Sequence, residues 1–463
     1  MIWNIGFAGE RHRQDRMSKA DIAAPPMAER ASQIYPWYLV GVLTMAYAFS
    51  FLDRYVLSLL VEPIKHDFGL SDFSVSLLQG FAFSIFFVVS GLPIGRLVDG
   101  SRRVTILALG IGCWSLMTVL CGLAGGFLGL LFCRIGVAIG EATLLPAGFS
   151  VIIDAVPRKR LGLAFGLFTM GAYIGAGLAF LLGGAVVARL AAQGGLSLPL
   201  VGSLEPWRGV FVLVGAPGLL LAFWAATLRE PARRENVSTG ARLSDVLAFF
   251  RSHAWTLTCL LLCGASAALS LQAITAWVPT LLIRTYGWTT AQAGTAFGAV
   301  VIPCGVFAVI AGGLIGDALT NRGRLDGRLI AMIGGSLLAT PFAVAAPLAG
   351  DARLTLLLLA PTIFFCTILI GNSPAALQEM LPSRLQGVAT AVAVLVSNLI
   401  GLGLGPTSVA FVTDFVLRDE AKLRYALAIV SLTGLIFSVM FGLLARRPYL
   451  ASRAALDGMA EER

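Results

Sequence analysis

The chain is built of long apolar runs separated by short polar connections. Twelve such runs are delimited by charged residues, glycine or proline, and each is long enough for a helix that crosses a bilayer, which takes about 20 apolar residues. We therefore predict an all-α polytopic membrane protein with twelve transmembrane helices. The predicted spans cover residues 38–60, 75–98, 103–123, 127–153, 161–190, 209–228, 255–283, 291–319, 328–348, 354–378, 386–414 and 424–445.

The composition agrees with this pattern. Of the 463 residues, 57% are hydrophobic and 13% are charged, against about 25% charged in soluble domains. The deficit of charge extends along nearly the whole chain and excludes a soluble enzyme, a fibrous chain and a disordered one. The seven cysteines all fall inside apolar runs, where we interpret them as small buried hydrophobic side chains.

A polar segment at residues 229–251 divides the spans into two sets of six. We predict a cytoplasmic tail over 1–37, a six-helix bundle over 38–228, a cytoplasmic linker over 229–254, a second six-helix bundle over 255–445 and a cytoplasmic tail over 446–463.

The two sets repeat one another. Residues 69–99 align with residues 287–317 without a gap, and the identical pairs include Gly69 with Gly287, Gly95 with Gly313, and Asp99 with Asp317. Each half thereby carries Gly-x-x-x-Asp at the end of its second span, and duplication explains this pattern.

The net charge of +9 comes mainly from basic residues in the connections. With both tails and every even-numbered connection on one side, that side holds about 24 Lys and Arg and the other side about 8, and short cytoplasmic loops collect such residues. We predict cytoplasmic termini in a cell (inner) membrane. The basic charge is then a topology signal rather than a surface for nucleic acid.

Four charged residues lie well inside predicted spans. A charge at the centre of a bilayer costs at least about 2.5 kcal/mol, so Asp53, Arg54, Arg134 and Glu141 must face an aqueous cavity or one another. Arg134 and Glu141 are two turns apart on one helical face. We predict that Asp53 and Glu141 take up protons, and that Arg54 and Arg134 pair with them and bind an anionic head group. A purely structural ion pair of Asp53 or Glu141 with Arg54 or Arg134 is the alternative.

The second half places few charges at its span centres. Its polar and aromatic candidates for lining a cavity are amides and rings, which gives a cavity that is polar on the first half and apolar on the second and suits an amphiphile. The alternative is that the amides only hydrogen-bond between helices. The possible lining residues are Tyr55, Gln272, Trp277, Phe364, Asn372 and Asn398.

No catalytic signature is present. The chain has no nucleotide-binding loop, no His-Glu-x-x-His and no serine placed beside a histidine, and its three histidines are too scattered for a metal site. We predict a protein that is not an enzyme, has no cofactor or metal, and does not use ATP.

The connection after the second span resembles the loop signature of the major facilitator superfamily. It reads Gly95-Arg96-Leu97-Val98-Asp99-Gly100-Ser101-Arg102-Arg103-Val104, which matches that signature at the first Gly, the Leu, the Asp and the second Arg of the Arg-Arg pair and departs from it at Gly100 and Val104. The resemblance extends over residues 35–447. It implies a transporter that works by alternating access, with Gly95, Asp99, Arg103 and, in the repeat, Asp317 as a gating motif. We expect Asp99 to cap or pair with a neighbouring helix end.

A closer resemblance is to the Spinster family of that superfamily. The first span carries Asp53-Arg54-Tyr55, the fourth carries Arg134-Ile135-Gly136-Val137-Ala138-Ile139-Gly140-Glu141-Ala142, and the sixth ends in Leu228-Arg229-Glu230-Pro231; Ala138 departs from the glycine of that family. In animals the family implies export of lysolipids or sphingosine 1-phosphate, which makes a lysolipid a candidate substrate here.

These observations lead to one main hypothesis and two alternatives. We expect a monomeric secondary transporter, embedded in lipid, that moves an amphiphilic anion or lysolipid, and both proton antiport and facilitated diffusion stay open. The first alternative is a symporter of a small organic anion, a carboxylate or sugar acid, which would need a compact anion site in the second half, where no span centre carries Lys or Arg. The second is a non-transporting receptor, which the retained span charges disfavour.

Overall fold

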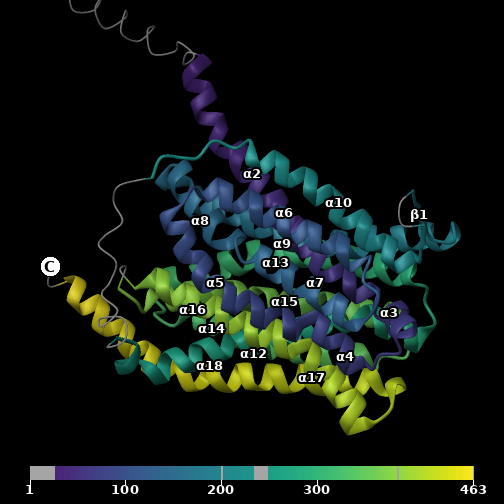
Figure 1. Ribbon diagram of the computed structural model, residues 1–463. Helices are drawn as coiled ribbons and strands as arrows, with labels where there is room; N and C mark the ends of the chain where they lie inside the picture. The colour runs from purple at the N-terminus through teal and green to yellow at the C-terminus, as the bar shows by residue number, and fades with distance from the viewer. Residues whose placement is uncertain (1–26, 200–201, 234–248, 383–384, 462–463) are drawn as a thin grey trace, which may run out of the picture.

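The computed structural model describes residues 27–199, 202–233, 249–382 and 385–461. Within these residues twelve helical segments are long and apolar enough to cross a membrane, as predicted, and Figure 1 shows them lying side by side along one common direction. The segments are Ile34–Leu59, Asp72–Gly100, Arg103–Cys121, Phe127–Ala155, Arg158–Ala192, Pro206–Ala226, Ala254–Tyr286, Thr290–Asn321, Gly327–Leu348, Ala352–Glu379, Ala389–Leu417 and Glu420–Ala454.

Several spans are made of more than one element. The first six comprise α2 (Met27–Val56), η1 (Leu57–Leu59), α4 (Asp72–Ser76), η2 (Leu77–Phe81), α5 (Ala82–Gly100), α6 (Arg103–Cys121), α7 (Phe127–Glu141), α8 (Leu144–Ala155), η3 (Arg158–Arg160), α9 (Leu161–Ala192) and α10 (Pro206–Ala226). The short helix α3 (Val61–Phe68) lies between the first two spans, and the strands β1 (Leu196–Leu198) and β2 (Gly202–Leu204) pair before α10. The last six comprise α12 (Ala254–Tyr286), α13 (Thr290–Asn321), α14 (Gly327–Leu348), α15 (Ala352–Glu379), α16 (Gln386–Ser397), η4 (Asn398–Leu404), α17 (Gly405–Phe411), η5 (Val412–Leu417), η6 (Glu420–Lys422) and α18 (Leu423–Glu461).

Two helices extend into the predicted tails. Helix α2 begins at Met27, inside the predicted first tail, and α18 continues to Glu461 through the predicted last tail. The predicted end of α18 lay at the charges Arg446 and Arg447, but arginine is a good helix former, so charge ends an apolar run without ending the helix. Residues 1–26 of the first tail and 234–248 of the linker lie outside the described residues.

The internal repeat has a matching backbone. Gly69 ends α3 with φ +64° and Gly287 ends α12 with φ +68°, both in the left-handed region that favours glycine. Two residues later, the side chain of Ser71 caps α4 and that of Thr289 caps α13, each by accepting a hydrogen bond from the third following N–H. The turn between the first two spans of each half therefore has the same construction.

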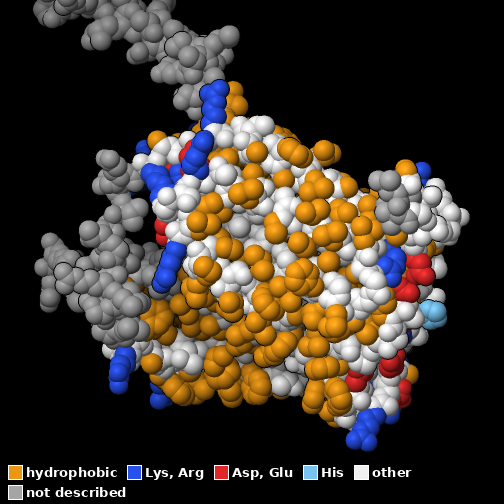
Figure 2. All heavy atoms as spheres, in the orientation of Figure 1, with side chains coloured by type: hydrophobic (Ala, Val, Ile, Leu, Met, Phe, Trp, Pro, Cys, Tyr) orange, Lys and Arg blue, Asp and Glu red, His pale blue; other side chains and the backbone are white. Residues whose placement is uncertain are grey.

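The two ends of the bundle differ in side chains. Apolar side chains form clusters between the helices, and Trp114, Trp207 and Trp277 are among the largest that are fully buried. Figure 2 shows an apolar face over α12 and α18, Lys and Arg gathered at the end that carries α8 and α16, and Asp and Glu gathered at the end that carries α3. We call these the predicted cytoplasmic end and the predicted extracellular end.

The halves pack tightly toward the predicted extracellular end. A Cβ at Gly80 of η2 would lie 2.1 Å from the carbonyl oxygen of Leu402 in η4, and a Cβ at Gly294 of α13 would lie 2.5 Å from the carbonyl oxygen of Phe180 in α9. Small residues thus let the backbones of opposite halves come into contact. Toward the other end, a Cβ at Gly95 or Gly313 would have no heavy atom within 4 Å, so neither packs against another helix.

Candidate substrate and proton site

The four predicted charges come together between α2 and α7. Asp53 and Arg54 lie in the last turn of α2, and Arg134 and Glu141 lie two turns apart on α7. Their exposed fractions are 2%, 6%, 0% and 1% in that order, so the cluster is almost completely removed from solvent. Charges this deep are stable only with close partners.

Glu141 has Arg54 as its partner. The Nη2 of Arg54 donates to Oε2 of Glu141 at 2.6 Å. The guanidinium carbon also lies 4.8 Å from the ring centroid of Phe51, 4.6 Å from that of Phe83 and 5.7 Å from that of Phe87. Aromatic faces attract a cation, most strongly in a desolvated place. One carboxylate and three rings therefore hold this guanidinium.

Arg134 makes no ion pair with Glu141 among the described residues, although both lie on one face of α7. Its Nη1 donates to the backbone oxygen of Asp53 and its Nε to that of Leu78, both at 3.4 Å. Its Nη2 is buried and has no hydrogen-bond partner in the described part of the chain. Arg134 thus ties α2 to η2 and retains one free donor.

The carboxylate of Asp53 is hydrogen-bonded to a hydroxyl rather than to an arginine. Its Oδ2 accepts from Oγ1 of Thr118 in α6 at 2.9 Å, and its Oδ1 is buried without a partner among the described residues. Thr118 could not be singled out from the sequence, since hydroxyls are common in apolar spans. A second residue that was not predicted is Gln79 of η2, which is 4% exposed and has no described partner for either amide atom. The signal for Gln79 was that it is the only amide in its apolar run.

Tyr55 and Gln272 connect the two halves on the side of this cluster that faces the predicted extracellular end. The hydroxyl of Tyr55 donates to Oε1 of Gln272 in α12 at 2.5 Å. Of the other predicted lining residues, Asn398 is half-buried at the start of π-helical η4 and donates to the oxygen of Val394 at 2.8 Å. Phe364 is half-buried on α15.

Two further predicted lining residues, Trp277 and Asn372, are buried and hydrogen-bonded to backbone oxygens of the second half. Trp277 is 0% exposed and its indole N–H donates to the oxygen of Pro406 at 2.9 Å. Asn372 is 1% exposed and its amide N–H groups donate to the oxygens of Gly312 and Ile368 at 3.0 and 2.9 Å. Both use a polar N–H to join helices in an apolar setting, and a place on a cavity wall stays a prediction for both.

Within the predicted gating motif, Arg103 is the buried centre of a network. It is 1% exposed, and it donates through Nε to Glu230 at 2.7 Å, through Nη2 to the oxygen of Pro231 at 2.7 Å and through Nη1 to Asp154. Burial raises the pKa of Glu230, but hydrogen bonds from the N–H of Val104 and from Arg103 outweigh it and hold that pKa below its ordinary value.

Asp99 does not pair as expected. Its side chain is exposed and makes no ion pair with any described residue, and the N-cap of α6 is Arg102. Arg233 instead donates to the backbone oxygen of Asp99 and to those of Val98 and Ser101. The C-terminal end of α5 is therefore held through its carbonyls rather than through the acidic side chain.

The repeat partner Asp317 does pair. Arg328 donates to Asp317 at 2.7 Å and to Glu379 at 2.6 Å, and Arg453 lies 3.2 Å from Glu379. The aspartates at equivalent positions of the two halves therefore differ, because Asp317 is part of a charge network and the side chain of Asp99 makes no ion pair with a described residue.

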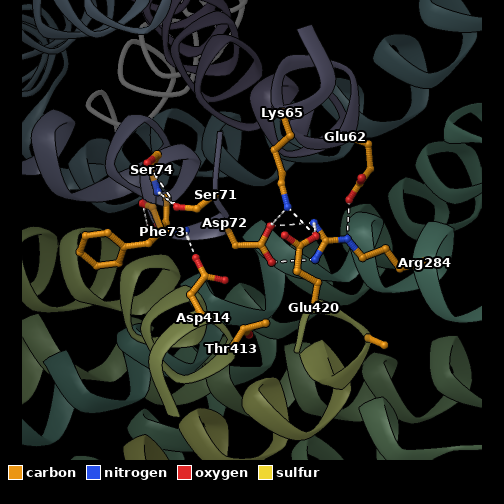
Figure 3. Close-up of polar contacts among 12 residues, drawn as sticks. Glu62, Lys65, Ser71, Asp72, Phe73, Ser74, Arg284, Thr413, Asp414 and Glu420 are labelled. Atoms are coloured by element: carbon orange, nitrogen blue, oxygen red, sulfur yellow. Dashed lines mark hydrogen bonds and ion pairs between the residues drawn. The ribbon is translucent and has the colours of Figure 1, made fainter. Parts of the chain in front are cut away.

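An ion cluster closes the predicted extracellular end (Figure 3). Asp72 of α4 is 0% exposed, and it accepts from Nζ of Lys65 at 2.5 Å and from two nitrogens of Arg284 at 2.7 Å each. Arg284 belongs to the other half and also donates to Glu62 at 2.5 Å, while Lys65 donates to Glu420 at 2.7 Å.

A backbone contact supports the same closure. The N–H of Phe73 donates to Asp414 of η5 at 2.8 Å, and Figure 3 shows this contact beside the Asp72 cluster. Lys65, Asp72 and Phe73 of the first half are thus all hydrogen-bonded to the second half at this end. The cluster could not be predicted from the sequence, because charges at span ends are common and carry no pairing signal.

A family profile and several proteins match the chain. The profile described as Major Facilitator Superfamily matches residues 43–406. The chain is 28% identical over 431 residues to an MFS-type efflux pump of Mycolicibacterium smegmatis, covering 91% of this chain and 95% of that protein. It is 27% identical over 382 residues to a probable L-galactonate transporter of Escherichia coli K12, covering 77% of this chain and 79% of that protein.

A solved structure matches at the level of the fold. It is a bacterial homologue of the human lysosomal transporter Spinster in an inward-facing and occupied conformation. The match has a TM-score of 0.74 and 27% identity, and it covers 90% of this chain and 97% of that one.

Proposed function

The chain belongs to the major facilitator superfamily, and from that premise we propose that it is a proton-coupled transporter of amphiphilic organic anions of the lysolipid kind. It is an integral multi-pass membrane transporter with a small-molecule substrate, and its family and relatives are transporters rather than enzymes. The observation that carries the proposal is the buried pair of Arg54 with Glu141, beside a second buried carboxylate, Asp53.

Proton binding and anion binding favour each other at this pair. When Glu141 takes up a proton it no longer attracts Arg54, and the guanidinium becomes available to an anionic group, which it binds through two parallel hydrogen bonds. When an anion occupies Arg54 instead, Glu141 is left as a buried carboxylate without a cation and takes up a proton. Coupling of this kind moves substrate and proton together.

The surroundings of Arg54 support an amphiphilic substrate. Phe51, Phe83 and Phe87 surround the guanidinium, and Tyr55 lies on the same helix next to it. An anionic head group placed at Arg54 would thus have aromatic and apolar side chains around its neighbouring carbon atoms. The similarity to a bacterial Spinster homologue supports the same class of substrate.

We further propose that this conformation faces the cytoplasm. The distribution of Lys and Arg supports cytoplasmic termini, and with that orientation the end closed by Asp72 and Arg284 is extracellular. A C-terminal fusion to green fluorescent protein would fluoresce in a bacterial host and a fusion to alkaline phosphatase would be inactive; the reverse result contradicts this orientation.

Transport in liposomes tests the function. Purified protein is reconstituted with a pH-sensitive dye inside, and radiolabelled sphingosine 1-phosphate, lysophosphatidylcholine and L-galactonate are added separately. We expect the phosphorylated lipid to enter together with protons. Glu141→Gln should abolish the proton flux, because the amide cannot be ionised.

Glu205→Gln is the matched control. Glu205 is exposed and lies at the start of α10, where it accepts a hydrogen bond from Trp207 at 3.1 Å, far along the chain from the central cluster. This variant should keep both fluxes. Uptake of substrate without proton movement in the unmodified protein would contradict the coupling, and Glu141 would then be a structural partner of Arg54.

A second candidate is a symporter of small sugar acids. The similarity to a probable L-galactonate transporter supports it. The same liposome assay decides between the two, because uptake of L-galactonate without uptake of either lipid would favour the sugar acid.

A further inference from the structure

We propose that Thr118 is a positioning residue for proton binding at Asp53, so that one rotating hydroxyl serves both the ionised and the protonated carboxyl. The inference rests on the proposed function, in which Asp53 takes up a proton. Thr118 is 0% exposed on α6 and faces Asp53 across the contact with α2.

The hydroxyl of Thr118 has two acceptors at equal distance. Its Oγ1 lies 2.9 Å from Oδ2 of Asp53 and 2.9 Å from the backbone oxygen of Trp114, one turn earlier on α6. A threonine hydroxyl has one proton to donate and two lone pairs that accept. At any moment it therefore donates to only one of these two oxygens.

This geometry satisfies both states of the carboxyl. When Asp53 is ionised, Thr118 donates to Oδ2. When Asp53 is protonated, its O–H donates to Oγ1, and the hydroxyl turns to the carbonyl of Trp114. Only a hydroxyl proton moves, so neither side chain has to leave its place, and neither state leaves this contact unsatisfied.

The charged and titratable groups near Asp53 come from three helices. Arg134 and Glu141 approach from α7, Arg54 is its neighbour on α2, and Cys121 lies one turn beyond Thr118 on α6. The only described hydrogen bond to the carboxylate itself comes from Thr118. A donated bond stabilises an ionised carboxylate more than a neutral one, so removing the hydroxyl should favour the protonated form.

The test is an infrared titration of Asp53 in the full chain reconstituted in lipid nanodiscs. The stretching band of the protonated carboxyl is assigned by its loss in Asp53→Asn and followed against pH. Thr118→Val keeps the shape and removes the hydroxyl, and we expect it to raise the titration midpoint by about one to two pH units. Thr118→Ser keeps the hydroxyl and should restore the original midpoint.

Thr362→Val is the matched control, because Thr362 is also 0% exposed and its hydroxyl donates to the oxygen of Leu358 at 2.9 Å on its own helix in the second half. It should leave the midpoint unchanged. An Asp53 band that titrates normally but does not move in Thr118→Val overturns this inference alone. An Asp53 band that does not titrate in the unmodified chain overturns the proton role of Asp53 and this inference with it.

Discussion

Arg284 of α12 and Asp72 of α4 form a bidentate ion pair between the two halves, in which Nη1 and Nη2 each donate to one carboxylate oxygen at 2.7 Å. Asp72 has no exposed surface, and Lys65 of its own half donates to it as well. This carboxylate therefore joins the halves at the end where they are closed.

Asp72→Asn should open that end. Removing one partner of a buried pair costs about 3–5 kcal/mol, and most of that cost falls on the closed conformation, so the ratio of closed to open conformation should fall by about a hundredfold or more. The distance between spin labels at Ser203 and Arg353, exposed residues of opposite halves near this end, should increase in a background without native cysteines. The measurement is pulsed electron paramagnetic resonance.

Asp67→Asn provides the comparison for this experiment. Asp67 lies at the same end and pairs with Arg208 at 2.9 Å, but both belong to the first half. Its label distances should equal those of the unmodified chain. Equal distances in Asp72→Asn too would mean that the other contacts at this end, such as those of Phe73 with Asp414 and of Glu62 with Arg284, keep it closed without the Asp72 carboxylate.

Arg54→Lys should reduce transport by about tenfold or more. Lysine can still pair with Glu141, but its ammonium is a point charge that lacks the planar fork and the flat contact with Phe51 and Phe83. Loss of a desolvated cation–π contact of about 2 kcal/mol accounts for this magnitude. The measurement is initial uptake into liposomes at matched protein density.

Arg208→Lys is the control for ring contacts as such. The guanidinium carbon of Arg208 lies 4.5 Å from the ring of Trp207 and 5.4 Å from that of Phe68, at the predicted extracellular end. Because this arginine is outside the central cluster, uptake should stay within a factor of two or so of the unmodified rate. An equal loss of uptake in Arg54→Lys and Arg208→Lys would show that the loss comes from disturbed packing of the rings rather than from the central cluster.

The central charges could be predicted from sequence, because charges in an apolar run are costly and rare. Their pairing could not. Arg134 and Glu141 share a face of α7, but they do not pair with each other. Helix α2 brings Arg54 next to Glu141, and Arg134 donates to backbone oxygens instead. Spacing along one helix says nothing about which side chain a second helix presents.

The twelve spans and the repeat could likewise be predicted, since both depend on local sequence. The closed end could not, because Lys65, Asp72 and Arg284 lie at span ends, where charge is ordinary. The hydrogen bonds of Trp277 and Asn372 could not be predicted for a related reason. A polar N–H in an apolar span can either face a cavity or donate to a neighbouring carbonyl, and only tertiary packing decides which of the two it does.

Glu230→Gln should lower stability in a pH-dependent way. The pKa of Glu230 lies below its ordinary value of 4.5, so its ionised form stabilises the fold above that pH, and the contribution is lost as the pH falls through the lowered pKa. The variant should melt at a lower temperature than the unmodified chain at neutral pH, and the difference should shrink in acid. The Glu205→Gln variant should show no such trend, and a constant difference across pH for Glu230→Gln would contradict the assignment.

Gly80→Ala should open the predicted extracellular end by a different route from Asp72→Asn. The added Cβ would meet the backbone oxygen of Leu402 at 2.1 Å, and since a backbone atom cannot turn aside, η2 and η4 must separate. Such overpacking costs about 1–3 kcal/mol, which should lower the melting temperature and lengthen the distance between the labels at Ser203 and Arg353.

Gly41→Ala on α2 is the control, because a Cβ at Gly41 would have no heavy atom within 4 Å. This variant should instead raise the melting temperature slightly, because alanine favours helix over glycine by about 1 kcal/mol. Opposite signs from the same substitution in two helices would place the contact between halves at Gly80, whereas an unchanged or higher melting temperature in Gly80→Ala would show that η2 and η4 do not touch there.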